Sequence, residues 1–91
     1  MTKLNDKKAL VTGATGEIGT AIVEELHENG CEIFISSTKE LALRNLSNEL
    51  KSRINFLPID LNSMENAQFL IDSAIKQMGA VDILVNNAGL T

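Results

Sequence analysis

The chain has 91 residues, of which 44% are hydrophobic and 22% charged, and its net charge is −4. This length and composition indicate one small soluble globular domain or part of a larger one. Its core must be aliphatic, because only 3% of the residues are aromatic. The acidic balance argues against nucleic acid and anionic membranes as partners, since both bind basic surfaces.

The cysteine content and the N-terminus point to a location. Cys31 is the one cysteine, so no disulfide forms within the chain, and a reducing compartment fits. The charged N-terminus is not followed by the apolar run of a signal peptide, and no stretch is long enough to span a membrane. We therefore expect a cytoplasmic protein. No residues have the spacing of metal ligands, so we expect no metal site.

The first half of the chain predicts a strand, a helix, a second strand and a second helix. A strand begins at Lys8 and runs into a glycine-rich turn at residues 12–16. A helix follows and ends at Asn29 and Gly30, because glycine tolerates the left-handed position after a helix. Residues 31–36 read as the second strand. The apolar positions that predict the first helix are Ile18, Ala21, Ile22 and Leu26. The second helix is predicted over residues 39–50, with Leu43, Leu46 and Leu50 on one side.

The second half predicts a strand, a helix and a last strand. Residues 54–59 form the third strand, with Pro58 near its end, where an edge strand tolerates a missing donor. Asn62 and Glu65 have the spacing of a capping box at the start of the third helix. Residues 81–85 form an apolar strand that we expect to be buried on both faces. The apolar stripe of the third helix consists of Met64, Ala67, Ile71, Ala74, Ile75 and Met78.

The order of the elements predicts the fold class. Strands that alternate with helices imply right-handed crossovers and a parallel sheet. The sequence therefore predicts an α/β fold of the Rossmann type, β-α-β-α-β-α-β, in a single domain over residues 1–91.

The most informative turn lies at residues 12–19, which read Thr-Gly-Ala-Thr-Gly-Glu-Ile-Gly. Gly13 permits a tight turn after the strand, a glycine in the loop lets a pyrophosphate approach the backbone, and Gly19 lets the helix pack closely on the sheet. The free N–H groups at the start of the helix then bind the phosphate. The alternative is a plain turn that uses glycine only for its positive φ.

These residues resemble the classical short-chain dehydrogenase/reductase family, whose turn reads Thr-Gly-x-x-x-Gly-x-Gly. The chain matches at Thr12, Gly13 and Gly19 and departs at Glu17, where the family has its second glycine. Gly16 fits the spacing of the extended members instead. Residues 81–89, Val-Asp-Ile-Leu-Val-Asn-Asn-Ala-Gly, resemble the fourth-strand motif of the classical branch. Within that branch, this motif is most similar to that of the 3-oxoacyl-[acyl-carrier-protein] reductases.

The resemblance implies strand order 3-2-1-4 and the N-terminal, truncated half of a doubly wound domain. It also implies an NAD(P)-dependent oxidoreductase that transfers hydride to or from a carbonyl, as in fatty acid biosynthesis. The family's catalytic Ser and Tyr-x-x-x-Lys segment lies beyond Thr91, and the chain has no Tyr. We therefore expect no catalytic residue and no activity in this chain alone. A non-catalytic nucleotide-binding half-domain and an inactive gene remnant stay open as alternatives.

The resemblance also assigns cofactor contacts. Asp60 would bind the adenine amino group, although a turn carboxylate that favours the next helix is the simpler alternative. An NAD enzyme has an acid where this chain has Ser37, and Lys39 could pair with a 2′-phosphate, so NADP(H) is favoured over NAD(H). Against this, Gly16 stands where NADP-dependent relatives often have Arg. The expected cofactor-binding residues are Gly13, Thr15, Gly16, Ile18, Gly19, Ser37, Thr38, Lys39, Asp60, Leu61, Asn87, Ala88 and Gly89.

Glu17 has two interpretations. An acid in the first turn of a helix favours the helix dipole by about 0.3–1 kcal/mol. Alternatively, its side chain stands where the pyrophosphate should lie, and it then weakens cofactor binding.

The resemblance finally predicts the partners. The substrate would be a carbonyl compound, either a small molecule or a group carried on acyl carrier protein. Full-length relatives would be homo-oligomers. In this chain the fourth strand would be an edge of the sheet, and because exposed apolar edges pair with other chains, we expect self-association.

Overall fold

The computed structural model describes residues 4–88. Gly89, which the family resemblance placed beside the cofactor, lies outside the described residues. The seven elements follow the predicted order. They are β1 (Lys8–Thr12), α1 (Glu17–Glu28), β2 (Glu32–Ser37), α2 (Glu40–Leu50), β3 (Ile54–Pro58), α3 (Met64–Met78) and β4 (Ile83–Asn86).

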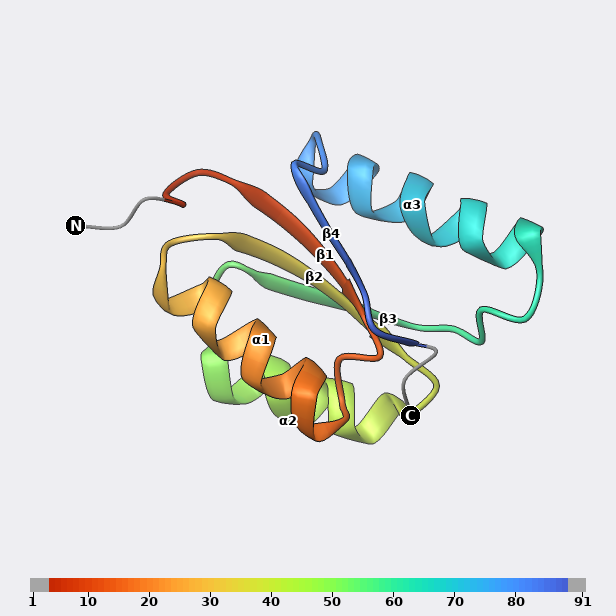
Figure 1. Cartoon of the computed structure of the whole chain (residues 1–91), viewed down its shortest axis with the longest axis horizontal. Helices are drawn as coiled ribbons and strands as arrows, with labels where there is room; N and C mark the ends of the chain where they lie inside the picture. Colours follow the sequence, from red (N-terminus) through yellow and green to blue (C-terminus); the bar gives the residue numbers. More distant parts are fainter. Residues whose placement is uncertain (1–3, 89–91) are drawn as a thin grey trace.

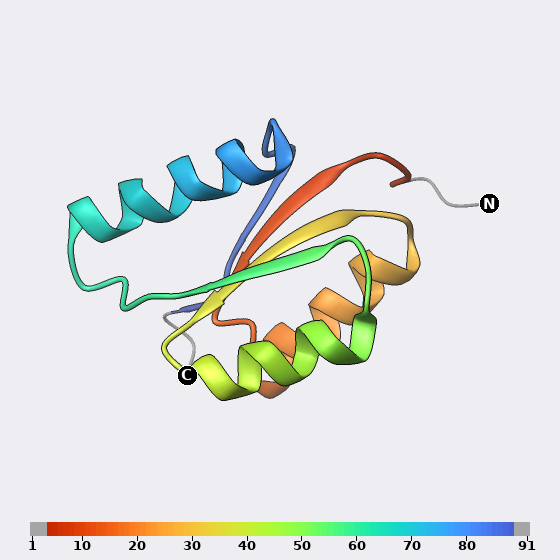
Figure 2. The same ribbon diagram turned by 180° about the vertical axis from the view of Figure 1, so that it is seen from behind.

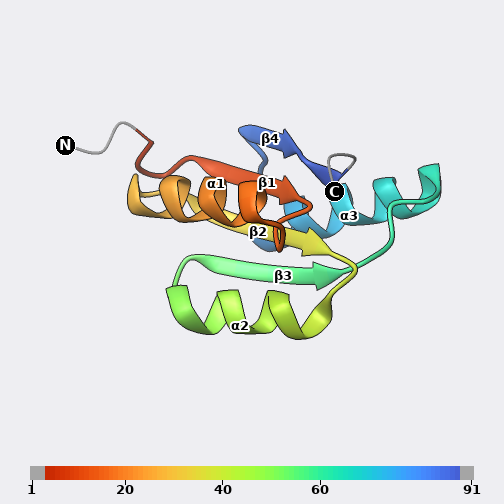
Figure 3. The same cartoon turned by 60° about the horizontal axis from the view of Figure 1, so that its bottom comes forward.

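The four strands form one parallel sheet in the order β3-β2-β1-β4. Helices α1 and α2 cover one face of the sheet and α3 covers the other, as Figures 1 and 2 show. The predicted α/β fold of the Rossmann type and its strand order are therefore confirmed. All four strands point the same way, so their carboxyl ends meet at one edge of the molecule (Figure 3).

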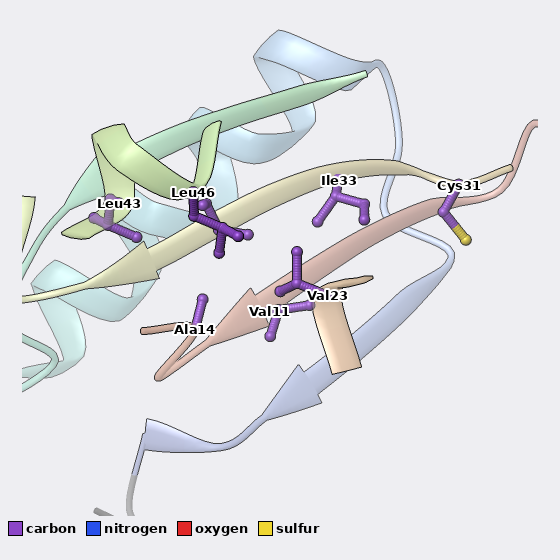
Figure 4. Close-up of a cluster of buried hydrophobic side chains, with 8 residues drawn as sticks. Val11, Ala14, Val23, Cys31, Ile33, Leu43 and Leu46 are labelled. Carbon is purple, nitrogen blue, oxygen red and sulfur yellow. The ribbon is translucent and has the colours of Figure 1, made fainter. Parts of the chain in front are cut away.

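The core has two layers because side chains alternate between the faces of a strand. On β2, Ile33 and Ile35 face α1 and α2, whereas Phe34 between them faces α3. On β1, Val11 likewise faces α1 and α2, and Leu10 faces α3. Figure 4 shows the first layer, with side chains from β1, β2, α1 and α2 in contact. The leucine face predicted for α2 is confirmed by the burial of Leu43 and Leu46.

Two details of α3 differ from the sequence prediction. Ser63, and not Asn62, caps the helix, and its hydroxyl accepts a hydrogen bond from the backbone N–H of Asn66 at 3.1 Å. The face that packs on the sheet consists of Leu70, Ala74 and Met78, whereas Met64 is 87% exposed. The predicted stripe was wrong in this respect because the helix carries more apolar residues than one sheet face can cover.

The predicted burial of the last strand on both faces was also wrong. β4 pairs with β1 alone among the described strands, and Leu84 is 57% exposed. Similarly, α1 buries Gly19 and Val23 against the sheet, while Ile18 from its predicted apolar pattern is 60% exposed. Both surfaces are apolar and lie at the margin of the described fold.

Candidate functional site

A cavity of about 360 Å³ opens at the carboxyl ends of the strands. Three connections meet there: the turn from β1 to α1, the turn from β2 to α2, and the segment that leaves β3. Ala88, which follows β4, completes the lining. The residues that line the cavity are Gly13, Thr15, Gly16, Ser36, Ser37, Thr38, Lys39, Ile59, Asp60, Leu61 and Ala88.

The glycine turn forms one wall of the cavity, and its glycines are required by close backbone contacts. Gly13 has φ +62°, and a Cβ there would lie 2.8 Å from the backbone oxygen of Asn87. Gly19 is buried, and a Cβ on it would overlap the backbone oxygen of Gly13. The turn is also tied to β2, because the N–H of Ala14 donates to the carbonyl of Ser36 at 3.1 Å.

Thr12 joins this turn to the end of β4. Its buried hydroxyl oxygen accepts hydrogen bonds from the backbone N–H groups of Asn87 at 3.0 Å and Ala88 at 3.2 Å. The same hydroxyl donates to the side-chain oxygen of Asn86 at 3.0 Å. The side-chain amide of Asn87 donates in turn to the carbonyl of Gly13 at 3.2 Å. Thr12 and the polar residues at the end of β4 thus form hydrogen bonds with one another and fix the backbone of the turn.

A cluster of hydroxyls lies at the end of β2. The hydroxyl of Thr15 donates to Ser37 Oγ at 3.1 Å, and the backbone N–H of Lys39 donates to the same oxygen at 2.9 Å. A serine oxygen has two acceptor sites and one proton. Both acceptor sites of Ser37 are therefore occupied, and its own proton is left to donate to a ligand.

The neighbouring Ser36 differs from Ser37. It is 1% exposed, and within the described part of the chain its hydroxyl has no hydrogen-bond partner. Asp60 lines the same cavity and is exposed, and its backbone carbonyl accepts a hydrogen bond from the side-chain amide of Asn66 at 2.8 Å. The charged side chains that line the cavity are thus one cation, Lys39, and one anion, Asp60.

Most of the residues expected to bind the cofactor line this one cavity, although they come from distant parts of the sequence. Three others lie elsewhere. Ile18 lies in a groove on α1, Gly19 is buried under the turn, and Asn87 braces the turn from behind. Sequence reasoning missed Ser36 and Ile59, although each directly precedes a predicted site residue at the carboxyl end of a strand.

Glu17 does not line the cavity. Its side chain is exposed and lies beside Ile18 and Ala21 in the groove on α1. At the start of α1, Gly16 is the N-cap, and no side-chain capping hydrogen bond is made among the residues that the structure describes. The N-terminal N–H groups of the helix are thus not occupied by a side-chain cap.

Cys31 lies at the opposite end of the sheet from the cavity. It is buried, and desolvation raises the pKa of its thiol above the ordinary value of 9.0, while the nearby Arg53 lowers it and Asp82 raises it. Cys31 directly precedes β2 and belongs to the hydrophobic core. Residues 4–88 contain no group of three or more potential metal-binding side chains and no helix long and apolar enough to cross a membrane.

Residues 7–91 match the family of short chain dehydrogenases. The chain belongs to the short chain dehydrogenase family.

Among relatives, nodulation protein G of Rhizobium sp. (strain N33) is 41% identical over 91 residues, which is all of this chain and 37% of that protein. An uncharacterized oxidoreductase of Staphylococcus aureus (strain USA300) is 38% identical over 90 residues, 98% of this chain and 39% of that protein. The chain thus spans less than half the length of these relatives.

A solved structure shares the fold. The 3-ketoacyl-(acyl-carrier-protein) reductase from Brucella melitensis, complexed with NADH, superposes with a TM-score of 0.85 at 22% identity. The match covers 90% of this chain and 34% of that protein.

Proposed function

We propose that this chain is the dinucleotide-binding part of an NADP(H)-dependent carbonyl reductase or alcohol dehydrogenase. The observation that carries the proposal is the single cavity that joins the glycine turn, the Ser37 cluster and Asp60. In open α/β sheets, ligands bind outside the carboxyl ends of the strands, where the strand order reverses. In this sheet the order reverses between β1 and β4, beside the glycine turn.

The residues present fit the parts of a dinucleotide. Ile59 and Leu61 provide apolar walls for a flat purine, and the Asp60 carboxylate between them can accept a hydrogen bond from an amino group. The start of α1 offers backbone donors to a pyrophosphate, which a helix N-terminus attracts.

The preference for NADP(H) rests on Ser37. An NAD enzyme needs an acceptor at this position for the ribose 2′-hydroxyl. Ser37 has no carboxylate to accept from that hydroxyl, and the Thr15 hydroxyl and the Lys39 backbone N–H already bond to its oxygen. A 2′-phosphate is an acceptor with negative charge, and the exposed Lys39 side chain can pair with it.

The nicotinamide would supply or accept a hydride, and a general acid must protonate the carbonyl oxygen. The 91 residues contain no Tyr, which is the family's acid, so we propose that this chain alone is inactive. The substrate class would be a carbonyl compound, such as the 3-oxoacyl group on acyl carrier protein in fatty acid biosynthesis, in the cytoplasm.

Titration of the chain with NADPH and NADH tests the proposal. We expect NADPH to bind more tightly, and Ser37→Asp to lower the ratio of the two affinities by at least about tenfold, because a carboxylate repels the phosphate and accepts from the 2′-hydroxyl. Ser52→Asp is the matched control, because it adds the same charge at the amino end of β3. Failure of both nucleotides to bind would refute the proposed function, and an unchanged ratio would refute the preference.

Substitutions of Glu17 test whether its carboxylate affects the binding of the pyrophosphate at the start of α1. We propose that its carboxylate weakens binding, so Glu17→Gly should bind NADPH about three- to tenfold more tightly, equivalent to about 0.7–1.4 kcal/mol. Glu17→Gln separates charge from bulk, since it keeps the size of the side chain. Equal dissociation constants for all three forms would leave Glu17 with its helix-dipole role alone.

We also propose that copies of the chain associate through β4. Its outer edge is unpaired within residues 4–88, Leu84 is exposed, and the strand has no charged residue to oppose a second copy. Gel filtration with light scattering should give at least a dimer, and Leu84→Lys should give a monomer. Met64→Lys adds the same charge on α3 and should not change the mass. A monomeric wild-type chain would contradict the proposal.

A further inference from the structure

We infer that Ser36 is a specificity-determining residue of the cavity, whose hydroxyl donates a hydrogen bond to a ring nitrogen of the purine base. The inference rests on the proposed function, because it requires a nucleotide in the cavity. It adds a residue that neither the glycine turn nor the Ser37 cluster supplies.

The first observation is the unsatisfied hydroxyl. Ser36 Oγ is buried and has no partner within the described part of the chain. A buried hydroxyl without a hydrogen bond is unfavourable, and nearly all such groups in folded proteins have a partner. The backbone of Ser36 is held in the sheet, since its carbonyl accepts from Ala14 and the residue pairs with Thr12. The side chain is thus the unsatisfied part of an otherwise bonded residue.

The second observation is the position of this hydroxyl. Ser36 lines the cavity together with Ile59 and Leu61. On β2 its side chain shares a face with Phe34, because side chains two apart in a strand lie on the same side. Ile59 and Leu61 pack against the cluster that contains Phe34. Ser36 is therefore a polar group on the face where two aliphatic side chains offer a surface for a flat base.

The third observation concerns the cost of reaching the ligand. A serine side chain has three staggered positions about χ1, and turning Oγ toward the cavity breaks no hydrogen bond, because none is made. Ser37 differs, since turning its hydroxyl would lose the bonds from Thr15 and Lys39. Ser36 is thus poised to respond to a ligand, whereas Ser37 is fixed before the ligand arrives.

Paired alanine variants test the inference. Ser36→Ala removes an unsatisfied group, so the ligand-free chain should melt at the same temperature as wild type or higher. Its affinities for AMP and NADPH should fall by the same factor, about three- to tenfold, the effect of one hydrogen bond. Ser36→Thr keeps the hydroxyl and should restore AMP binding to within about twofold. Ser37→Ala is the control, because it removes a bonded hydroxyl and should lower the melting temperature.

Three outcomes would overturn the inference. Wild-type affinity of Ser36→Ala for AMP and NADPH would show that the hydroxyl does not meet the ligand. A lower melting temperature together with weaker binding that Ser36→Thr does not restore would show a structural role. If the wild-type chain binds neither nucleotide, the proposed function itself fails, and the inference fails with it.

Discussion

The two ends of the parallel sheet are built differently. At the amino end, the Arg53 guanidinium donates to the carbonyls of Cys31 at 2.8 Å and His27 at 3.2 Å, and the Asp82 carboxylate accepts from the N–H of Lys8 at 2.9 Å. At the carboxyl end, the backbone is braced just as firmly, but side-chain donors remain available beside a cavity. Both ends thus hold the fold together, and the carboxyl end also keeps an unused hydroxyl beside a cavity, where a ligand can reach it.

The largest expected effect on stability comes from disrupting the close backbone contact between α1 and the glycine turn at the carboxyl end of the sheet. Gly19→Ala places a Cβ against the backbone oxygen of Gly13, which cannot move without opening the turn. We expect a loss of about 3 kcal/mol or more in the free energy of unfolding, measured by urea denaturation. Gly79→Ala is the control, since a Cβ there meets nothing within 4 Å and only its φ of +90° opposes it. Equal losses in the two variants would show that the turn is not tightly packed.

Thr12→Val should have the next largest effect. It leaves the buried N–H groups of Asn87 and Ala88 without the hydroxyl acceptor and should cost about 2 kcal/mol. Thr12→Ser keeps the oxygen and should lose much less. Denaturant unfolding of both variants measures the difference, and the idea fails if the serine form is as unstable as the valine form.

Arg53→Ala tests the amino end. It removes two charge-assisted hydrogen bonds at a largely exposed site, so we expect a loss of about 1 kcal/mol in stability, with NADPH affinity unchanged. Arg44→Ala removes an exposed pair with Glu40 and should cost less. A change in NADPH affinity in Arg53→Ala would show that the two ends do not act separately.

The smallest expected effect is a pH dependence at Cys31. Burial raises the pKa of this thiol above 9.0, so the folded state favours the neutral form. The contribution to stability is complete below pH 9.0 and is lost as the pH rises through the pKa of the folded state. The difference in unfolding free energy between wild type and Cys31→Ala should therefore shrink above pH 9.0. A difference in unfolding free energy that does not change with pH would contradict this expectation.

The sequence predicted the elements well, because strands that alternate with helices imply a parallel sheet. The strand order followed from the resemblance to the short-chain dehydrogenase/reductase family. The sequence prediction failed where burial depends on neighbours. Leu70 lies in the contact face of α3 although the predicted stripe omitted it, and Leu84 is exposed although its strand reads as fully buried. Apolar periodicity locates a helix but does not decide which of two apolar faces meets the sheet.

The residues of the candidate site were assigned from the family resemblance, and most of them line one cavity because the carboxyl ends of parallel strands meet at one edge of the sheet. The Ser37 cluster was foreseen by position, but not the use of both its acceptor sites by Thr15 and Lys39. Ser36 was missed because nothing in the sequence says whether a strand hydroxyl finds a partner. That depends on the packing of three separate segments. The assignment of residues 1–91 to one domain stays a prediction.

The most direct test is an NMR titration of the 15N-labelled chain with NADPH. The nucleotide should shift the amide signals of residues 13–16, 36–39 and 60–61, which come from the three connections around the cavity. Signals at the amino end of the sheet, such as those of Lys8, Glu32 and Arg53, should not move. Shifts confined to the amino end, or no shifts at a saturating concentration, would contradict a nucleotide site at the carboxyl ends of the strands.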